Sequence, residues 1–264
     1  MTANRHVGPP ALEVVTPRGL DSIAPLETLA LPFTVRVVRT EEHLSKAIGI
    51  RAETYSRHHP DLARNLEEPE AADRSPFSLV LLAESKADGS AVGTMRIETN
   101  TTTPHFVESL LPANSRFTGR TIAFVTRLGV YRGVNAQLVK LAIFKALYRY
   151  CLACQIDWII VAARAPMDRQ YLKLSFTDVY PDGTRVQISN SGQVPARLLA
   201  LETITAEQEW RSADHPLYGF MIKDFTPDIA IFSSVSGTWA RSRTKSGRLP
   251  STAALDEVFG ITVV

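Results

Sequence analysis

The stretch TIAFVTRLGVYRGVNAQLVKLAIFKALYRYCLACQIDWIIVAA, residues 121–163, decides the fold. Its first ten residues, 121–130, predict a strand. Residues 133–153 predict a long helix, because their apolar side chains recur at helical spacing. The run 157–163 is apolar almost throughout, which is typical of a strand covered on both faces. We therefore expect a strand, a long helix and a buried strand at the centre of the chain.

The flanking segments add further elements on both sides. Three strands are predicted before the central stretch, at residues 33–38, 77–84 and 91–98, the last two joined by a turn with an Asp-Gly step. A helix behind the N-cap Thr40 follows the first strand. After the central stretch we expect a short helix at 167–174, a hairpin around residues 181–183 and a helix at 206–212. This order predicts an α/β (α+β) fold, a mixed sheet with helices on both faces.

Composition divides the chain into three parts. Residues 1–32 contain five prolines without clear periodicity and form a loosely packed N-terminal arm. Residues 33–190 carry the regular elements of the core. Residues 191–264 form a C-terminal extension that could serve as a lid or dimer surface, with a basic tail between Arg241 and Arg248.

Several classes of protein are disfavoured by composition. The 264 residues are 45% hydrophobic with a net charge of +2, which argues against a disordered chain and against a nucleic-acid-binding protein. The sequence has no signal peptide and no run of 18 apolar residues, so we expect a cytoplasmic protein without a membrane span. Cys151 and Cys154 lack a second ligand pair for zinc, and no metal site is expected.

Four short motifs carry a resemblance to a known family. They are Arg51 with Tyr55, Val92-Gly93-Thr94-Met95-Arg96-Ile97, Thr126-Arg127-Leu128-Gly129-Val130, and Tyr171-Leu172-Lys173-Leu174-Ser175-Phe176. In this order the chain resembles the GNAT acyltransferase superfamily, in particular the branch of autoinducer (acyl-homoserine lactone) synthases and N-acyl amino acid synthases. The similarity covers residues 33–179, including the long excursion at 99–120 that the branch shares.

The resemblance implies a mostly antiparallel sheet whose central strands splay apart, and a thioester bound at the splay. Backbone N–H groups near Val130 would polarise the thioester carbonyl. Tyr171 would protonate the departing thiolate. The alternative for Tyr171 is a core residue with a satisfied hydroxyl.

Two departures from the family pattern bear on the substrates. Arg132 and Gly133 begin the loop that cradles the coenzyme A pyrophosphate in GNAT enzymes, but Asn135 stands where a glycine belongs. This favours acyl carrier protein, whose phosphopantetheine has one phosphate, over coenzyme A as the donor. Phe124 replaces the glutamate with which autoinducer synthases bind or deprotonate the amine, which argues against homoserine lactone synthesis.

Charged residues on the predicted strands and first helix supply the remaining candidates. Arg96 and Arg127, and less strongly Arg51, either form structural ion pairs, with Glu98 or Asp73, or bind the carboxylate of an amino acid acceptor. Candidates for the general base are Glu98, His105, Glu84 and Asp73, with Glu98 preferred because it shares a strand face with Arg96.

The sequence thus predicts an acyltransferase that moves a long-chain acyl group from acyl carrier protein to the α-amine of an amino acid. The predicted site comprises Tyr171, Glu98 and Arg127 as catalytic residues, Arg51, Arg96, Val130 and Phe124 at the substrates, and Arg132, Gly133 and Asn135 at the donor phosphate. No permanently bound cofactor is expected, and a homodimer is one possible assembly. The alternatives are a coenzyme A-dependent GNAT acyltransferase and a catalytically silent acyl-binding module. The acyl length, the acceptor and the base stay open.

Overall fold

The computed structural model describes residues 28–57, 63–133, 135–188, 195–232 and 250–251. The strands are β1 (Phe33–Val37), β2 (Ser78–Ser85), β3 (Ala91–Thr99), β4 (Ile122–Val130), β5 (Trp158–Ala163), β6 (Thr177–Asp178), β7 (Arg185–Val186), β8 (Ala196–Glu202) and β9 (Ile229–Ala230). The helices are α1 (Glu41–Ser56), α3 (Ala136–Ala153), α4 (Met167–Leu172) and α5 (Ala206–Ser212). Short turns of 3₁₀ helix, η1 (Ala71–Arg74) and η2 (Phe106–Leu110), and a π-helical turn, η3 (Gly219–Lys223), complete the set.

All described strands belong to one sheet, in the order β6-β8-β5-β4-β3-β2-β1-β9, with β7 also paired to β8. The β4–β5 and β1–β9 pairs are parallel, and the other pairs are antiparallel. The prediction of a mixed, mostly antiparallel sheet is confirmed.

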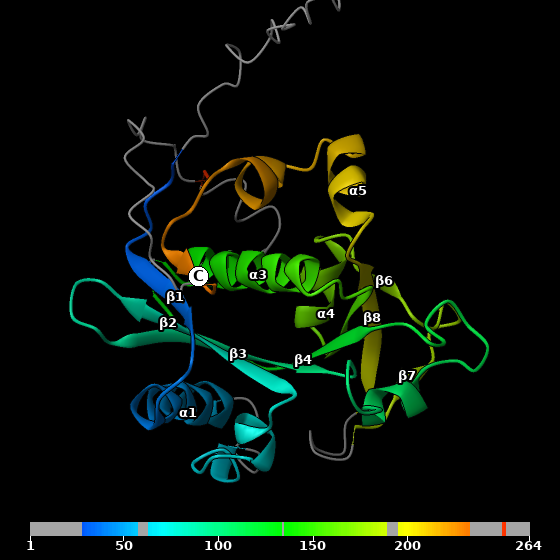
Figure 1. Ribbon diagram of the computed structural model, residues 1–264, viewed down its shortest axis with the longest axis horizontal. Helices are drawn as coiled ribbons and strands as arrows, with labels where there is room; N and C mark the ends of the chain where they lie inside the picture. The colour runs from blue at the N-terminus through cyan, green and yellow to red at the C-terminus, as the bar shows by residue number, and fades with distance from the viewer. Residues whose placement is uncertain (1–27, 58–62, 134, 189–194, 233–249, 252–264) are drawn as a thin grey trace, which may run out of the picture.

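Helices cover both faces of the sheet, as predicted (Figure 1). α1 lies on one face, and α3 lies on the other face together with α5. Strand alternation divides the core accordingly, because successive side chains point to opposite faces. Ala123 and Val125 of β4 belong to the large core that contains α3, whereas Phe124 between them belongs to a second apolar cluster.

The contact between α3 and β3 requires a glycine. A Cβ atom on Gly93 would lie 2.6 Å from Cγ1 of Val139 and 2.9 Å from Cδ1 of Ile143, both on α3.

We predict that Gly93→Ala lowers the free energy of unfolding by about 1–3 kcal/mol, because the added methyl group overpacks this contact. Gly49→Ala is the matched control: Gly49 is an exposed glycine of α1 with nothing within 4 Å of the new Cβ. It should stabilise the protein by about 0.5–1 kcal/mol. Urea unfolding of both variants measures the difference, and equal effects would contradict the packing argument.

The C-terminal extension contributes to the same sheet. β5 pairs along its whole length with β8, from Trp158↔Glu202 to Ala163↔Arg197, and β9 pairs with β1. β6 and β7 each pair with β8 and not with each other, so the predicted hairpin around residues 181–183 is wrong. The part of the N-terminal arm that is described is anchored, since Leu29 is buried and its N–H donates to the carbonyl of Phe225. The three-part division stays a prediction, and residues 1–27 and the basic tail lie outside the described residues.

The two central parallel strands separate at one end of the sheet. Pairing between β4 and β5 runs from Ile122↔Trp158 to Val125↔Val161. β4 then continues to Val130 and β5 to Ala163 without further ladder partners between these two strands. We call this opening the fork. It confirms the prediction of splayed central strands.

Candidate active site

A bulge in β4 explains why the fork opens. Arg96 pairs with Thr126 and Thr94 pairs with Gly129, so two residues of β4, Arg127 and Leu128, face one residue of β3. Arg127 has a φ of 55°, a left-handed conformation that is uncommon for a residue other than glycine. Because a bulge bends its strand and increases the local twist, it turns the end of β4 away from β5.

The side chain of Arg127 is held by a bidentate ion pair. Its Nε donates to Oε2 of Glu70 at 2.7 Å and its Nη2 donates to Oε1 at 2.6 Å. Only 7% of the Arg127 surface is exposed. Burial raises the pKa of Glu70, but the hydrogen bond and charge of Arg127 outweigh burial, so this pKa lies below its usual range. A paired geometry of this kind can maintain the strained backbone at Arg127.

The same acidic segment binds the other two arginines. Nη1 of Arg96 lies 2.8 Å from Glu70 and 3.2 Å from Asp73. Nη1 of Arg51 on α1 donates to Asp73 at 2.6 Å. The side chain of Asp73 is fully buried, and both arginines are almost fully buried. The three guanidinium groups therefore form one network with carboxylates that approach from η1 and from the residue before it.

Arg51 leaves two of its nitrogen atoms without a partner. Its Nε and Nη2 are buried and form no hydrogen bond within the described structure. Burial lowers the pKa of Arg51, although Asp73 opposes this effect. A bound water or a polar substrate atom would satisfy these donors.

Glu98 on β3 is the third carboxylate of the network and pairs with Arg96. Its carboxylate accepts hydrogen bonds from Nε of Arg96 at 3.0 Å and from the Thr126 hydroxyl at 2.9 Å, and it lies 3.4 Å from Nε2 of His105. Burial raises the pKa of Glu98, but the bond to His105, the charge of Arg96 and the bond from Thr126 outweigh it, and the pKa falls to about 2. A carboxylate of this low basicity is a weak general base. The base role of Glu98 stays a prediction, and this pKa weighs against it.

The low pKa of Glu98 predicts a defined acid sensitivity. A depressed folded-state pKa stabilises the protein at pH values above the unfolded value of 4.5, and this stabilisation is lost as the pH falls toward about 2. Glu98→Gln removes the titrating group, so the free energy of unfolding of this variant should fall less steeply between pH 4.5 and 2 than that of the wild type. Urea unfolding across this range measures both slopes. Parallel curves would contradict the assigned pKa.

Tyr171 lies on α4 and is buried among aromatic rings. Its ring centroid is 5.4 Å from that of Phe144 on α3 and 5.3 Å from that of Phe176. Burial, and to a lesser extent the nearby Tyr55, raises the pKa of Tyr171 well above its usual range. The phenol is therefore protonated at neutral pH, but it is a weaker acid than an ordinary tyrosine. The acid role of Tyr171 stays a prediction, and this pKa weighs against it.

Tyr55 interacts electrostatically both with Tyr171 and with the three arginines of the network. Burial raises the pKa of Tyr55, while the positive charges of Arg127, Arg51 and Arg96 oppose this shift. Tyr55 thus lies within electrostatic range of all three arginines and of the Tyr171 hydroxyl. α1 also closely approaches the end of β4, since a Cβ on Gly129 would lie 2.7 Å from Oγ1 of Thr54. The C-terminal turn of α1 therefore lies against the bulged end of β4 beside the fork.

Phe124 occupies an apolar position on β4. It is 2% exposed, and its ring contacts those of His105 and Phe106 at centroid distances of 5.6 and 5.4 Å. Its cross-strand partner on β3 is Glu98. A carboxylate is therefore available beside Phe124, but from the neighbouring strand.

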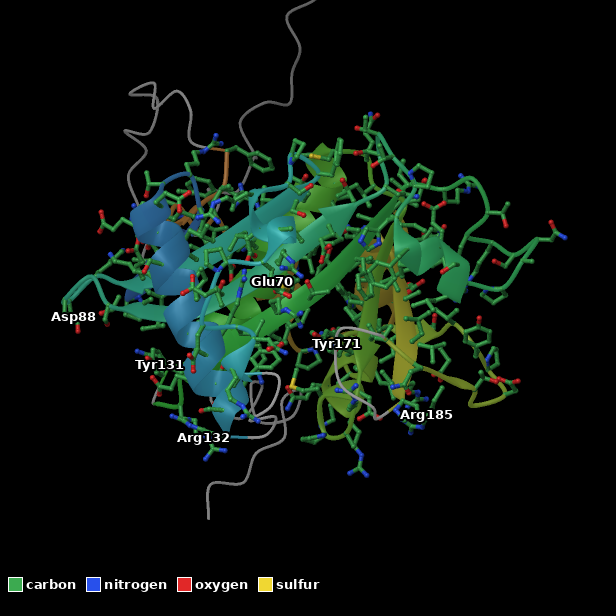
Figure 2. The ribbon with its side chains drawn as sticks, turned by 90° about the horizontal axis from the view of Figure 1, so that it is seen from below. Glu70, Asp88, Tyr131, Arg132, Tyr171 and Arg185 are labelled. Atoms are coloured by element: carbon green, nitrogen blue, oxygen red, sulfur yellow. The ribbon has the colours of Figure 1, made fainter. Side chains whose placement is uncertain are left out.

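The predicted donor-phosphate residues lie at the rim of the molecule. Arg132, Gly133 and Asn135 are all exposed and precede α3, with Asn135 as its N-cap. A Cβ on Gly133 would contact nothing within 4 Å, so no close backbone approach requires a glycine there. Figure 2 shows Glu70 and Tyr171 toward the centre and Arg132 near the edge. The donor role of these residues stays a prediction.

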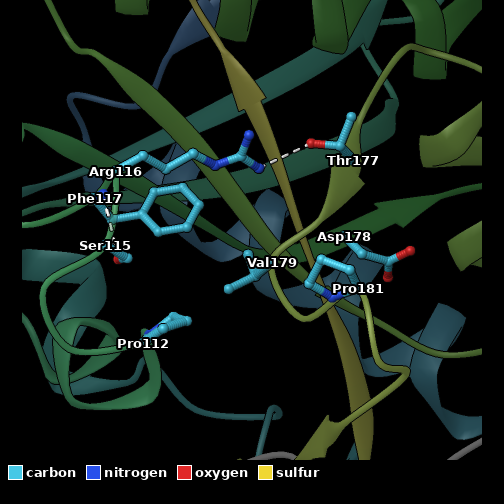
Figure 3. Close-up of a pocket in the computed structure, with 8 residues that line it drawn as sticks. All are labelled: Pro112, Ser115, Arg116, Phe117, Thr177, Asp178, Val179 and Pro181. Carbon is cyan, nitrogen blue, oxygen red and sulfur yellow. Dashed lines mark hydrogen bonds between the residues drawn. The ribbon is translucent and has the colours of Figure 1, made fainter.

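An open groove of about 640 Å³ lies elsewhere on the surface, between the excursion before β4 and the segment around β6 (Figure 3). Arg116 borders it and donates from Nη2 to the Thr177 hydroxyl at 3.1 Å. None of the three network arginines, Tyr171 or Val130 lines this groove. Its size alone does not make it a reaction site, because the buried side chains with shifted pKa values, Glu70, Glu98 and Tyr171, do not line it.

Two further properties complete the description. Among the residues that the structure describes, no three His, Cys, Asp or Glu side chains are grouped to hold a metal ion. Within the same ranges, no helix combines the length and apolar character needed to cross a bilayer.

The structure brings Arg51, Arg96, Arg127 and Glu98 into one cluster. Arg96 pairs with both expected partners, Glu98 and Asp73, and Arg51 pairs with Asp73, whereas Arg127 pairs with Glu70 instead. Sequence reasoning missed Glu70, which binds two of the three arginines. The available signal was the acidic segment 67–73 before β2, which holds four carboxylates for the three buried arginines.

Neither protein-family models nor curated protein sequences match this chain. Solved structures share its fold. FeeM, an N-acyl amino acid synthase from uncultured soil microbes, matches at a TM-score of 0.52 and 18% identity over 67% of this chain and 93% of FeeM. Two structures of BjaI, a CoA-dependent acyl-homoserine lactone synthase, match at 0.52 (with MTA) and 0.50 (with SAM and isopentyl-CoA). Both are 15% identical and cover 86% of this chain and 99% of BjaI.

At these identities the likeness establishes the fold. The resemblance inferred from the four sequence motifs is therefore confirmed at the level of the fold. What the two synthases act on remains a property of those proteins.

Proposed function

We propose that this protein is an N-acyltransferase that moves a long-chain acyl group from a pantetheine thioester to the α-amine of an amino acid. The observation that carries the proposal is the fork, where β4 extends beyond its last pair with β5 at Val125↔Val161. Strand residues freed from one ladder expose backbone N–H groups, which are hydrogen-bond donors fixed in position. Such donors can stabilise the oxyanion that forms when an amine attacks a thioester.

The reaction requires one proton transfer to the leaving group. The amine nitrogen bonds to the carbonyl carbon, the carbon–sulfur bond breaks, and the sulfur leaves as a thiolate. Tyr171 carries a proton at neutral pH, as an ordinary tyrosine does. It is proposed as the proton donor because it lies on the α3 face near the fork, and not because of its raised pKa, which makes it a weaker acid.

The arginine network orders the site in this proposal. Glu70 already occupies Nε and Nη2 of Arg127, so an acceptor carboxylate could bind there only after displacing Glu70. The network fixes the left-handed backbone at Arg127 and with it the bulge that opens the fork. This supports a positioning role for Arg127 and Arg96, and it leaves Arg51, with two unpaired donors, as the arginine best able to bind a substrate oxygen.

Acyl carrier protein is proposed as the donor. The exposed loop at Arg132, Gly133 and Asn135 provides no close cradle for a pyrophosphate, which supports a donor with a single phosphate. BjaI is a CoA-dependent enzyme of the same fold, so coenzyme A is the competing donor. The free thiols of Cys151 and Cys154 are compatible with the proposed cytoplasmic location.

The test uses the full-length protein with acyl carrier protein and coenzyme A thioesters of graded length, each mixed with the twenty common amino acids. Mass spectrometry of the products should reveal an N-acyl amino acid, formed faster from the carrier-protein thioester. Faster reaction with the coenzyme A thioester would replace the proposed donor. The absence of N-acyl product with either donor would leave a silent acyl-binding module and contradict the proposed function.

A further inference from the structure

His105 is the residue at which the excursion before β4 meets the charged network. It is the N-cap of η2, and only 16% of its side-chain surface is exposed. Its ring lies beside those of Phe106 and Phe124, at centroid distances of 4.5 and 5.6 Å. Both ring nitrogens have a polar neighbour: Nδ1 lies 3.2 Å from the backbone nitrogen of Val107, and Nε2 lies 3.4 Å from Oε2 of Glu98.

These two neighbours fix the tautomer of the neutral ring. A backbone N–H can only donate, so Nδ1 accepts the bond from Val107 and carries no proton. The proton of the neutral imidazole is therefore on Nε2, where it faces a carboxylate oxygen of Glu98, which can only accept. Neutral His105 thus has no free lone pair with which to deprotonate an amine. This geometry weighs against His105 as the general base.

Glu98 divides its two oxygen atoms between His105 and the arginine network. Oε2 faces His105, whereas Oε1 accepts from Nε of Arg96. Burial raises the pKa of Glu98, and the bond to His105 is the largest of the effects that lower it. Arg96 in turn contacts Glu70, which holds the bulged Arg127. A chain of polar contacts therefore runs from η2 through His105 to the residue at which β4 bends.

We propose that His105 is a positioning residue whose protonation state controls the excursion. In the neutral form its Nε2–H holds Glu98 and its Nδ1 caps η2. Protonation at Nδ1 turns the last acceptor of the ring into a donor, because an imidazolium has two N–H groups and no free lone pair. The bond to Glu98 then becomes an ion pair, while the N–H of Val107 loses its partner.

The lost cap has structural consequences because Val107 is fully buried. A buried N–H without a partner is costly, and water reaches this one only if η2 moves. Phe106 belongs to the same turn, is 48% exposed and packs edge to face on Phe124 at 5.4 Å. Protonation of His105 should therefore release the start of η2 together with Phe106, while Glu98 stays bound.

Two carboxylates lie next to His105 within the described part of the chain. Glu98 on β3 lies at Nε2, with Arg96 behind it. Glu108 on η2 accepts the backbone N–H of His105 at 2.8 Å. β4 presents the uncharged ring of Phe124. Protonation thus strengthens one contact of the ring and breaks the other, so a test has to follow both nitrogens.

The first test reads the tautomer and the cap directly and needs no turnover. In full-length protein labelled with ¹⁵N in its histidine rings, the neutral His105 should carry its proton on Nε2. His215 is an internal standard, since its Nδ1 accepts from the N–H of Leu217 and its Nε2 lies 2.8 Å from the carbonyl oxygen of Lys173. As His105 titrates, the protection of the Val107 amide against hydrogen exchange should fall about 2–30-fold, the worth of a side-chain cap. A proton on Nδ1 of the neutral ring, or protection that does not follow the titration, would overturn the inference.

The second test separates the two contacts of the ring by substitution. His105→Asn keeps an acceptor for the cap, since asparagine is a favoured N-cap residue, but its shorter side chain gives up the bond to Glu98. His105→Gln keeps a donor long enough to reach Glu98 and is a poor cap. Neither side chain titrates. Protection of Val107 should therefore be independent of pH in both variants, high in His105→Asn and low in His105→Gln. The same protection in both would contradict the capping role.

The effect on turnover rests on the proposed function and is measured as a ratio. Dividing kcat/KM of the wild type by that of His105→Asn at each pH cancels the titration of the amine acceptor. This ratio should fall about 2–10-fold as the pH drops through the midpoint measured for His105, the worth of one hydrogen bond. A constant ratio, or a loss of about 10²–10⁴-fold in both variants as expected for a general base, would overturn the inference. A wild type that makes no N-acyl product would contradict the proposed function alone, because the exchange measurements still decide the role of His105.

Discussion

Replacement of Asp73 by alanine should lower the free energy of unfolding by about 3–5 kcal/mol, the largest stability effect expected at the site. Asp73 is fully buried and pairs with both Arg51 at 2.6 Å and Arg96 at 3.2 Å. Its loss leaves two buried guanidinium groups with fewer counter-charges. Chemical denaturation measures the effect, and a change below about 1 kcal/mol would contradict the account of the network, because that is the range of exposed pairs.

Glu41→Ala provides the control for this experiment. Glu41 pairs with Arg74 through two hydrogen bonds, but both side chains are more than half exposed. Screening by water should make its loss barely detectable. The comparison separates the effect of burial from that of merely removing a carboxylate.

Replacement of Tyr171 by phenylalanine should reduce kcat by about 10²–10⁴-fold with little change in KM, because the thiolate then leaves without a proton donor. The ring contacts with Phe144 and Phe176 persist in the variant, so its thermal stability should stay close to that of the wild type. Steady-state kinetics with the preferred donor, together with a melting curve, provide both values.

Leaving-group chemistry supplies the internal control for Tyr171→Phe. An aryl thioester releases a more stable thiolate than pantetheine does, so it needs less help from a proton donor. The rate deficit of the variant should therefore shrink with aryl thioesters. A deficit of the same size with both kinds of donor, or none with pantetheine, would contradict the acid role.

The regular parts of the fold were predictable because the apolar spacing and the turn residues of each segment fit the place that the segment takes in the folded protein. The periodic apolar residues of α3 are buried against the sheet, and the Asp-Gly step at Asp88 and Gly89 forms the turn between β2 and β3. β8 was missed because its sequence ARLLALE consists mainly of helix-forming residues. Its strand conformation is imposed by pairing with β5 and β6, partners far away in sequence.

The candidate site was predictable in its arginines and in part of their counter-charges. Buried arginines on strands require counter-charges, which made Arg96 and Arg127 conspicuous and pointed to Glu98 and Asp73, but the partner of Arg127 was not found from the sequence. Glu70 lies in a charged segment without an apolar pattern that would predict burial, and only the folded arrangement brings it to within 2.7 Å of Arg127. The bulge at Arg127 was equally hidden, since arginine has no preference for positive φ.

Hydrogen exchange of the β4 amides tests the central claim, that the fork binds the thioester, most directly. The ligand is an acyl-pantetheine analogue in which a methylene replaces the sulfur, so that the resulting ketone cannot expel a thiolate. We predict slower exchange at residues 126–130, beyond the last pair with β5, and no change at residues 122–125, which are already paired on that side. Unchanged exchange at 126–130 in the presence of saturating analogue would contradict the proposal that this opening is the acyl-transfer site.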